Sequence, residues 1–267
     1  MRILRTLRAV PTLLRVGFVE SIAYRAEFAI WLLATNMPLV MLALWTAVAR
    51  DGPIGRYGQA EFTAYFLAAL VVRLLTGAWV IWELTFEIRQ GTLAYRLLRP
   101  VHPLVAYACE NVAAMPLRLV LSLPITIVLL LTIGRDHVTH DPLLIAMFPM
   151  TVVGAWLITF LAMAIVGTLA FRYDSATSLF EIWMGLFGVL SGYLVPLDLF
   201  PPWVGALSRV LPFRYMLSFP VELITGALDR AAAFRNLGAQ WLFVTILFIG
   251  ASAAWRLGLR RYAAFGG

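Results

Sequence analysis

Residues 83–103 read ELTFEIRQGTLAYRLLRPVHP and lie between two long apolar runs. This segment is too polar for the interior of a lipid bilayer, and its spacing predicts a short helix that begins after Gly91. The Thr92 hydroxyl is placed to cap the first turn, and the ring of Pro100 ends the helix. A helix this short is not stable alone in water, so we expect it to pack against another surface.

The two faces of this helix suggest what that surface is. Leu93 and Leu97 fall on one face, and Arg96 and Arg99 fall on another. The helix could rest on lipid headgroups as an interfacial elbow, with its leucines in the membrane. It could also fit a groove on a second, water-soluble protein. The residue pattern alone leaves both interpretations open.

The composition identifies the class of protein. Of 267 residues, 62% are hydrophobic and 13% are charged, whereas about a quarter of a soluble domain is charged. The chain is therefore predicted to be an integral membrane protein. It contains no lysine, and all 21 basic residues are arginine. Because a phosphate-binding P-loop needs its lysine, any ATP that drives this protein must be bound by another polypeptide.

Residues 1–25 contain five arginines and no unbroken apolar core, so we interpret them as a helix lying in the membrane surface and not as a signal peptide. Their apolar side chains recur at helical spacing, opposite the arginines: Ile3, Leu7, Val10, Leu14 and Phe18. The lone Cys109 excludes an internal disulfide and is interpreted as a packing residue.

The remaining chain predicts six membrane-spanning helices in a single transmembrane domain, residues 1–267, with no internal repeat. Each apolar run reaches the roughly 20 residues needed to cross a bilayer. We place the spans at 27–49, 62–85, 106–133, 142–170, 175–197 and 235–257. Four prolines fall inside them and predict kinks: Pro38, Pro116, Pro124 and Pro149. An even number of spans puts both termini on one side of the membrane.

The distribution of arginines predicts which side that is. Twelve arginines fall on the side shared by the termini, and seven fall on the opposite side. Arginine accumulates in cytoplasmic segments of membrane proteins. Both termini and the segment 86–104 are therefore expected in the cytoplasm, and residues 198–234 outside.

The predicted external segment 198–234 is apolar but interrupted by prolines. Val204–Leu211 and Val221–Leu228 are each too short to span a bilayer. We expect two half-helices that enter the outer leaflet and return, a geometry that requires packing against protein or a cavity. An ordinary external loop is the alternative.

Five charged residues fall at membrane depth or within a turn of it: Arg73, Glu83, Glu110, Arg118 and Glu181. Because such charges are costly in lipid, we expect interhelical ion pairs, with Arg118–Glu181 as the first candidate. Arg73 and Glu83 are too far apart along one helix to pair. A substrate path is the alternative role for these residues.

The sequence offers little support for catalysis. A metal site could be imagined at Asp136, His137, His140 and Asp141, but a short exposed loop provides no buried shell around such a site. No nucleophile, base and orienting group occur together. We therefore expect no catalytic residue and no metal site.

Two segments carry a resemblance to a known family. These are EIRQGTLAYRLLRPVHP at residues 87–103 and GYLVPLDLFPPWVGALSRVLPFRYMLSFP at residues 192–220. With the surface helix and six spans, they resemble the membrane subunit of type-2 ATP-binding-cassette exporters, in particular small, paired permeases of the multidrug type. The glycine before a short helix that ends in Arg-Pro is the more specific match.

The resemblance implies that the short helix is a coupling helix that docks into a separate nucleotide-binding ATPase. Its contact residues would be Glu87, Arg89, Gly91, Thr92, Leu93, Tyr95, Arg96, Leu97, Arg99 and Pro100. The external segment would close the exit path, with a gate formed by Pro196, Pro202, Pro212, Phe213 and Pro220. ATP and Mg²⁺ would be bound by the ATPase, and this chain would hold no cofactor.

The expected function is that of an export permease in the cytoplasmic membrane, which moves an amphipathic, drug-like or lipid-like molecule. Its partners would be ATPase subunits, a second identical or homologous permease, and membrane lipids, but no nucleic acid. A proton-coupled carrier is the alternative, with Glu181 as its titrating acid. A membrane-embedded lipid transferase is less consistent with the sequence, since it lacks a carboxylate cluster for Mg²⁺.

Overall fold

The computed structural model describes residues 2–23, 37–128, 136–173 and 176–262. These residues form helices joined by turns and short loops, and no strand occurs among them. The prediction of an all-helical protein is confirmed for this part of the chain. Parts of three predicted spans, residues 27–36, 129–133 and 175, lie outside the described residues.

The helices follow one another along the chain as the apolar runs predict. They are α1 (Arg2–Ala23), α3 (Met37–Val48), α4 (Gln59–Thr76), α5 (Val80–Gln90), α6 (Leu93–Leu97), α7 (Pro103–Ala113), α8 (Met115–Val128), α9 (Pro142–Thr168), α10 (Ala176–Leu190), α11 (Pro202–Val210), α12 (Phe213–Met216), α13 (Ser218–Ile224) and α14 (Arg230–Leu259). Short 3₁₀ helices follow α3, α9 and the turn after α10, at Ala49–Asp51, Leu169–Phe171 and Leu197–Leu199.

Three helical segments among the described residues are long and apolar enough to cross a membrane. They are Gln59–Gln90, which combines α4 and α5, Pro142–Phe171 and Arg230–Leu259. These segments correspond to the second, fourth and sixth predicted spans. Helix α10 is apolar but has only 15 residues. The count of six spans stays a prediction.

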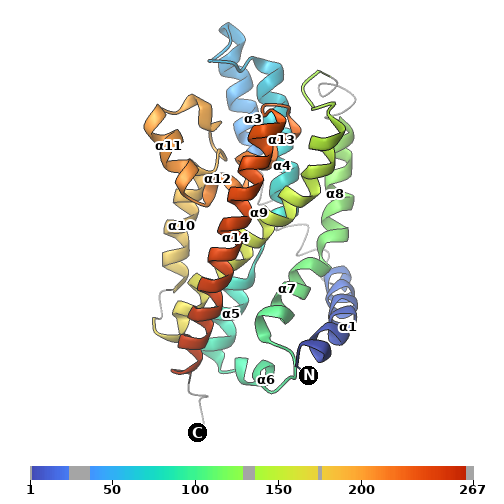
Figure 1. The fold of residues 1–267 in the computed structure, drawn as a ribbon, viewed down its shortest axis with the longest axis vertical. Coiled ribbons are helices and arrows are strands. Elements are labelled where there is room, and N and C mark those ends of the chain that lie inside the picture. Colours follow the sequence, from blue (N-terminus) through green and yellow to red (C-terminus); the bar gives the residue numbers. More distant parts are fainter. Residues whose placement is uncertain (1, 24–36, 129–135, 174–175, 263–267) are drawn as a thin grey trace.

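Helix α9 is the centre of the bundle (Figure 1). Helix α14 packs along it, and α4, α5, α10, α12 and α13 also contact it. A glycine permits the close approach of α14, because a Cβ on Gly154 would lie 2.6 Å from Gln240 Oε1. The Gln240 amide donates from Nε2 to the backbone oxygens of Thr151 and Tyr215, each at 2.9 Å. This amide therefore ties α14 to both α9 and α12.

The second predicted span, 62–85, is not one continuous helix, which corrects the prediction. Helix α4 ends at Thr76 and α5 begins at Val80. Side chains from the third predicted span bond the backbone groups that this break exposes. Arg118 Nη1 donates to the oxygen of Gly77 at 2.5 Å, and Asn111 Oδ1 accepts from the backbone nitrogen of Trp79 at 3.1 Å.

The third predicted span, 106–133, is also interrupted. Helix α7 ends at Ala113, and α8 begins at Met115. Pro116 lies in the first turn of α8, where its missing N–H costs no helical hydrogen bond. The other prolines expected inside spans lie at the start of α3 (Pro38) and within α8 and α9 (Pro124, Pro149). The interruptions of the second and third predicted spans lie beside each other, because Asn111 and Arg118 bond to the backbone of Trp79 and Gly77.

The predicted external segment contains three short helices where two half-helices were expected, a second correction. Helix α11 replaces Val204–Leu211, and α12 and α13 replace Val221–Leu228 with an earlier start. The chain leaves helical geometry at Leu217, where φ is −143° and ψ is −61°. Helices α12 and α13 pack on α9, while α13 also packs on α4.

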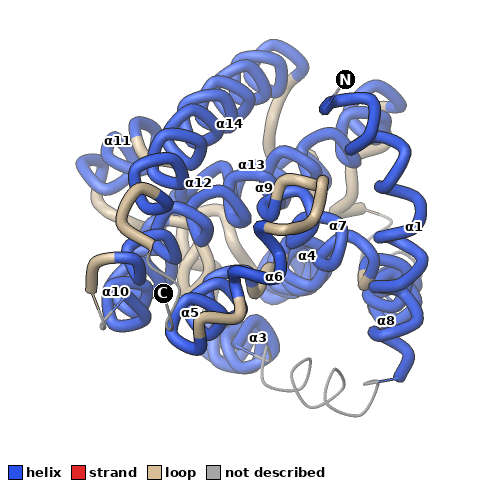
Figure 2. The backbone as a smooth tube through the Cα atoms, turned by 90° about the horizontal axis from the view of Figure 1, so that it is seen from below, coloured by secondary structure: helices blue, strands red, loops and turns tan. Residues whose placement is uncertain are grey.

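Helix α1 forms as predicted and contains Pro11. It packs against α7, where a Cβ on Gly17 would lie 2.9 Å from the Cβ of Ala113. Val10 and Leu14 are partly buried, whereas Phe18 is 38% exposed. Figure 2, which looks along the long axis of Figure 1, shows α1 extended across the view beside α7 and α8. The side chains of Ile3 and Leu7 lie outside those described.

The short helix α6 and the interrupted segment α11–α13 lie at opposite ends of the molecule (Figure 1). The turn between α3 and α4 lies at the same end as α13. The fold therefore separates the two sequence segments that were singled out, one at each end of the bundle.

Candidate functional site

Helix α6 is held in a sharp turn after α5. Gly91 adopts φ 72°, a left-handed conformation that favours glycine, and its N–H donates to the oxygen of Ile88 at 3.2 Å. The prediction that the Thr92 hydroxyl caps α6 is wrong, because Thr92 has helical angles and its side chain makes no cap hydrogen bond. The Tyr262 hydroxyl donates to the oxygen of Gly91 at 2.9 Å. This bond ties the turn to the segment after α14.

The apolar side of α6 is anchored by one leucine. Leu93 is fully buried, whereas Leu97 is 37% exposed. Among the two leucines, the helix therefore packs on the bundle through Leu93 and leaves Leu97 partly exposed.

Arg96 lies inside the α5–α6–α7 corner and not on the outer surface. Its Nε lies 2.7 Å from Glu87 Oε1, and its Nη1 lies 2.6 Å from Glu110 Oε1. The Tyr107 hydroxyl donates to Glu87 Oε2 at 2.7 Å, and the guanidinium lies 4.2 Å from the centre of the Tyr107 ring. These four residues, called the Arg96 cluster below, join α6 to α5 and to α7.

The Arg96 cluster is poorly accessible. Side chains of its three charged members are 16–21% exposed. This location corrects the expectation that Arg96 and Arg99 share an outer face, since Arg99 is exposed. The cause is Glu110, which α7 brings against the inner side of α6 and which draws the guanidinium inward.

The outer surface of α6 is formed by other residues. Tyr95 is 70% exposed and Leu98 is 84% exposed. Arg89, Arg99 and Pro100 are also exposed beside them. Leu98 was absent from the predicted contact residues, although its spacing of three from Tyr95 places both on one face of a helix. We call Tyr95, Leu98 and Arg99 the α6 tip.

His102, just after the α6 tip, caps the next helix. Its Nδ1 accepts from the backbone nitrogen of Leu104 at 3.2 Å, and its ring centre lies 5.5 Å from that of Trp255 on α14. Partial burial and the nearby Arg256 guanidinium lower the pKa of His102. The neutral imidazole therefore keeps Nδ1 available as an acceptor at pH 7.

The charged residues predicted at membrane depth do not form the expected ion pair. Arg118, which is 2% exposed, bonds to Gly77 and lies 4.9 Å from the centre of the Trp79 ring. Glu181 is exposed on α10. The predicted Arg118–Glu181 pair is therefore wrong, because the carbonyl oxygen of Gly77, at the end of α4, is the negative partner of Arg118.

The other charged residues at this depth have aromatic or polar neighbours. Glu83 Oε1 accepts from Trp79 Nε1 at 2.9 Å. The guanidinium of Arg73 lies 5.3 Å from the centre of the Phe187 ring. Glu110 belongs to the Arg96 cluster. Trp79 and Glu83 therefore lie beside the interruption between α4 and α5, and Glu110 contacts α6.

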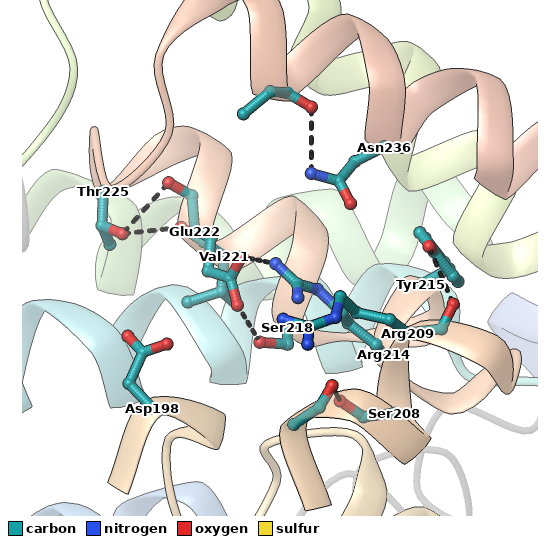
Figure 3. Close-up of polar contacts among 12 residues, drawn as sticks. Asp198, Ser208, Arg209, Arg214, Tyr215, Ser218, Val221, Glu222, Thr225 and Asn236 are labelled. Atoms are coloured by element: carbon teal, nitrogen blue, oxygen red, sulfur yellow. Dashed lines mark hydrogen bonds and ion pairs between the residues drawn. The ribbon is translucent and has the colours of Figure 1, made fainter. Parts of the chain in front are cut away.

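At the opposite end, a buried ion pair holds the interrupted segment (Figure 3). Arg214 Nη2 lies 2.5 Å from Glu222 Oε2, and the Ser218 hydroxyl donates to Glu222 Oε1 at 2.6 Å. Phe213 is buried and its ring centre lies 4.5 Å from that of Trp183. The ion pair joins α12 to α13 and fixes their angle.

The five predicted gate residues occupy different environments. Pro196, Phe213 and Pro220 are buried, Pro212 is partly buried, and Pro202 is exposed at the start of α11. Pro202 and Pro220 lie in the first turns of α11 and α13, where proline is tolerated. Two of the prolines therefore help to start helices of the segment, and the role of the five residues as a gate stays a prediction.

The loop that could imitate a metal site has another structure. Asp141 caps α9 by accepting from the backbone nitrogen of Leu143 at 2.9 Å, and it pairs with Arg230 at the start of α14. Within the described residues, no group of three His, Cys, Asp or Glu side chains could hold a metal ion.

Comparison with known proteins gives one finding. The family model described as ABC-2 family transporter protein matches residues 33–266. This range contains α3 to α14, the Arg96 cluster and the α6 tip. Among curated proteins, none matches the chain significantly.

Proposed function

Because this chain belongs to the ABC-2 family of transporter proteins, we propose that it is the permease subunit of an ATP-driven exporter. It crosses the cytoplasmic membrane six times with both termini inside, and it pairs with a second, identical or homologous permease. ATP and Mg²⁺ are bound by a separate ATPase subunit. The cargo is amphipathic, drug-like or lipid-like, because the described bundle interior is mainly apolar.

The observation that carries this proposal is the α6 tip. Tyr95 is 70% exposed and Leu98, just after α6, is 84% exposed, and neighbouring exposed apolar side chains mark an interaction site. Both side chains project at the end of the molecule opposite the interrupted segment. Tyrosine and arginine are enriched among the residues that contribute most to binding at protein interfaces, and the α6 tip exposes both Tyr95 and Arg99.

The Arg96 cluster supports the same function, because it can transmit force from the tip. When ATP draws two ATPase subunits together, a docked α6 follows them. Arg96 bonds to Glu87 on α5 and to Glu110 on α7. When α6 moves, α5 and α7 must therefore move with it, or a partly buried ion pair breaks. The interruptions at Gly77–Trp79 and at Ala114 then allow α5 and α7 to move relative to α4 and α8.

The test uses a variant that alters only the tip. Tyr95→Ala combined with Leu98→Asp should weaken ATPase binding by about a thousandfold, since each of the two lost anchors typically costs about 2 kcal/mol and about 1.4 kcal/mol corresponds to a factor of ten. The permease is purified with its ATPase from membranes, and the amount of retained ATPase and its ATP hydrolysis are measured. Arg96 is unsuitable for this test, because replacing it would also break the Arg96 cluster.

Tyr173→Ala provides a control. Tyr173 is 54% exposed and follows the helical segment that packs on α5, but it is not part of the α6 tip. The control should retain the ATPase and its stimulation. Normal binding and normal ATP hydrolysis in the Tyr95 and Leu98 variant would show that α6 is not the docking site.

A further inference from the structure

A cavity of about 190 Å³ lies at the end of the molecule opposite α6. Three segments that are far apart in the sequence form its walls: the turn before α4 with the first turns of α4, the loop before α9, and α13 with the residues that follow it. Seven of its ten lining residues carry polar side chains: Arg56, Tyr57, Glu61, Tyr65, His137, Glu222 and Thr225.

Hydrogen bonds fix these walls relative to one another. The backbone nitrogen of Thr139 donates to the oxygen of Ile224 at 2.8 Å, which joins the loop before α9 to α13. The Tyr65 hydroxyl donates to the oxygen of Gly192 at 2.8 Å. Gly226, at φ 68°, lets the backbone pass close to Thr139. The cavity is therefore a built feature and not a gap between loose loops.

The positive groups at the cavity are already engaged. Arg56 pairs with Asp198 and also donates to the Tyr57 hydroxyl at 2.9 Å. Arg214, behind the wall, is paired with Glu222. Burial raises the pKa of Tyr57, so its hydroxyl stays protonated at neutral pH and adds no negative charge.

The negative groups exceed the positive ones. Among the lining residues, Glu61 and Glu222 stand against Arg56, which leaves one excess negative charge when His137 is counted as neutral. The ion-pair partners of two of these residues, Asp198 and Arg214, have opposite charges and do not change this balance. Glu61 Oε2 accepts from the backbone nitrogen of Gly58 at 2.9 Å. Glu61 Oε1 lies 3.9 Å from His137 Nδ1, beyond hydrogen-bond distance. Within the described residues, this oxygen has no hydrogen-bond donor.

We propose that this cavity binds a primary ammonium group. The free Glu61 oxygen, the Glu222 carboxylate and the Tyr65 oxygen offer acceptors to a group that has three N–H donors and no acceptor. An ammonium group also balances the excess charge. It could belong to an aminophospholipid headgroup or to an amine on the transported cargo.

The test measures binding of ethanolammonium to the purified full chain by ligand-observed NMR titration, without nucleotide or ATPase. Glu61→Gln keeps an oxygen for the Gly58 N–H but removes the charge, and we expect at least tenfold weaker binding. Ala227→Leu fills the cavity without changing any charge and should weaken binding equally. Asp51→Asn is the control, because Asp51 is exposed at the same end but does not line the cavity.

A second arm distinguishes the sources of the ammonium group. In nanodiscs that contain phosphatidylethanolamine, a lipid ligand would compete and lower the affinity for ethanolammonium relative to discs of phosphatidylglycerol alone. Equal affinity in both discs would assign the site to an amine of the cargo. Either result supports the proposal.

Four results would overturn it. These are no binding by the unaltered protein, unchanged binding in both Glu61→Gln and Ala227→Leu, equal weakening by Asp51→Asn and Glu61→Gln, and equal affinity for choline, which has no N–H donors. Because no ATP is present, these outcomes do not depend on whether α6 docks an ATPase.

Discussion

Arg96 joins three helices in this fold through its side chain. It lies between two carboxylates, Glu87 and Glu110, that belong to different helices. Like charges at such short range are tolerated only because the guanidinium lies between them. The Tyr107 hydroxyl completes the set by donating to Glu87. The cluster is thus a local balance of charges that one substitution can upset.

Replacing Arg96 with Met should therefore destabilise the protein. It leaves two poorly hydrated carboxylates without their cation, a change that typically costs about 3 kcal/mol or more. Thermal unfolding of the purified protein in detergent measures the effect. Arg99→Met removes an exposed arginine from the same segment and should change the unfolding temperature little. Equal unfolding temperatures for the two variants would contradict this assignment.

Gly154 is the second residue where a small change has a large expected effect. A methyl group there would lie 2.6 Å from Gln240 Oε1, so Gly154→Ala displaces the Gln240 amide from its bonds to Thr151 and Tyr215 and should cost about 1–3 kcal/mol. Gly238→Ala, on α14, meets nothing within 4 Å and should be neutral or stabilising by up to about 1 kcal/mol. The two unfolding temperatures should move in opposite directions. Equal shifts would argue against this packing.

Residue spacing predicted the local structure of the site but not the contacts between residues that are far apart in the sequence. Spacing predicted α6 between Gly91 and Pro100. It could not show that Arg96 points inward, because that depends on where α7 places Glu110, 14 residues away. For the same reason Arg118 was matched with the wrong partner. Its partner is a backbone oxygen at a helix end, and no side-chain pattern reveals such an acceptor.

At the scale of elements, the two interrupted helices support each other. The end of α4 exposes backbone groups at Gly77 and Trp79, which in lipid would be costly without partners. Asn111 and Arg118, from either side of the interruption at Ala114, supply those partners. The side chains beside the interruption at Ala114 therefore make the hydrogen bonds that the backbone at Gly77 and Trp79 lacks.

Asn111→Ala tests this relation. Asn111 is fully buried, and its loss leaves the Trp79 N–H without an acceptor, which should cost about 2 kcal/mol. Asn236→Ala is the matched control, since the Asn236 amide bonds only within its own helix, to Ala232 at 2.9 Å. Both variants are compared by thermal unfolding in detergent. If the control loses as much stability as Asn111→Ala, the bond to Trp79 has no special role.

Hydropathy predicted where the apolar runs lie but not where they break. No proline or polar residue lies at Gly77–Trp79, so the pattern gave one span over 62–85. In the external segment the sequence did signal the breaks, because its prolines predicted short helices. Their number was wrong, since the turn at Leu217 follows from packing and from the Arg214–Glu222 pair and not from a proline.

At the scale of the whole molecule, the two ends have different chemistry. One end carries the α6 tip, with exposed Tyr95 and Leu98 above the Arg96 cluster. The other carries the interrupted segment α11–α13 and the cavity lined by Glu61 and Glu222. The arginine distribution predicts that the first end is cytoplasmic. A permease powered by a cytoplasmic ATPase requires this orientation, and the whole account depends on it.

Labelling of single cysteines tests this orientation most directly. In a Cys109→Ala background, cysteine is introduced at Leu98 on the α6 tip or at the exposed Arg50 at the opposite end. A membrane-impermeant maleimide is then applied to intact cells and to permeabilised cells. The account predicts that position 50 is labelled in intact cells and that position 98 is labelled only after permeabilisation. Labelling of position 98 in intact cells would contradict it.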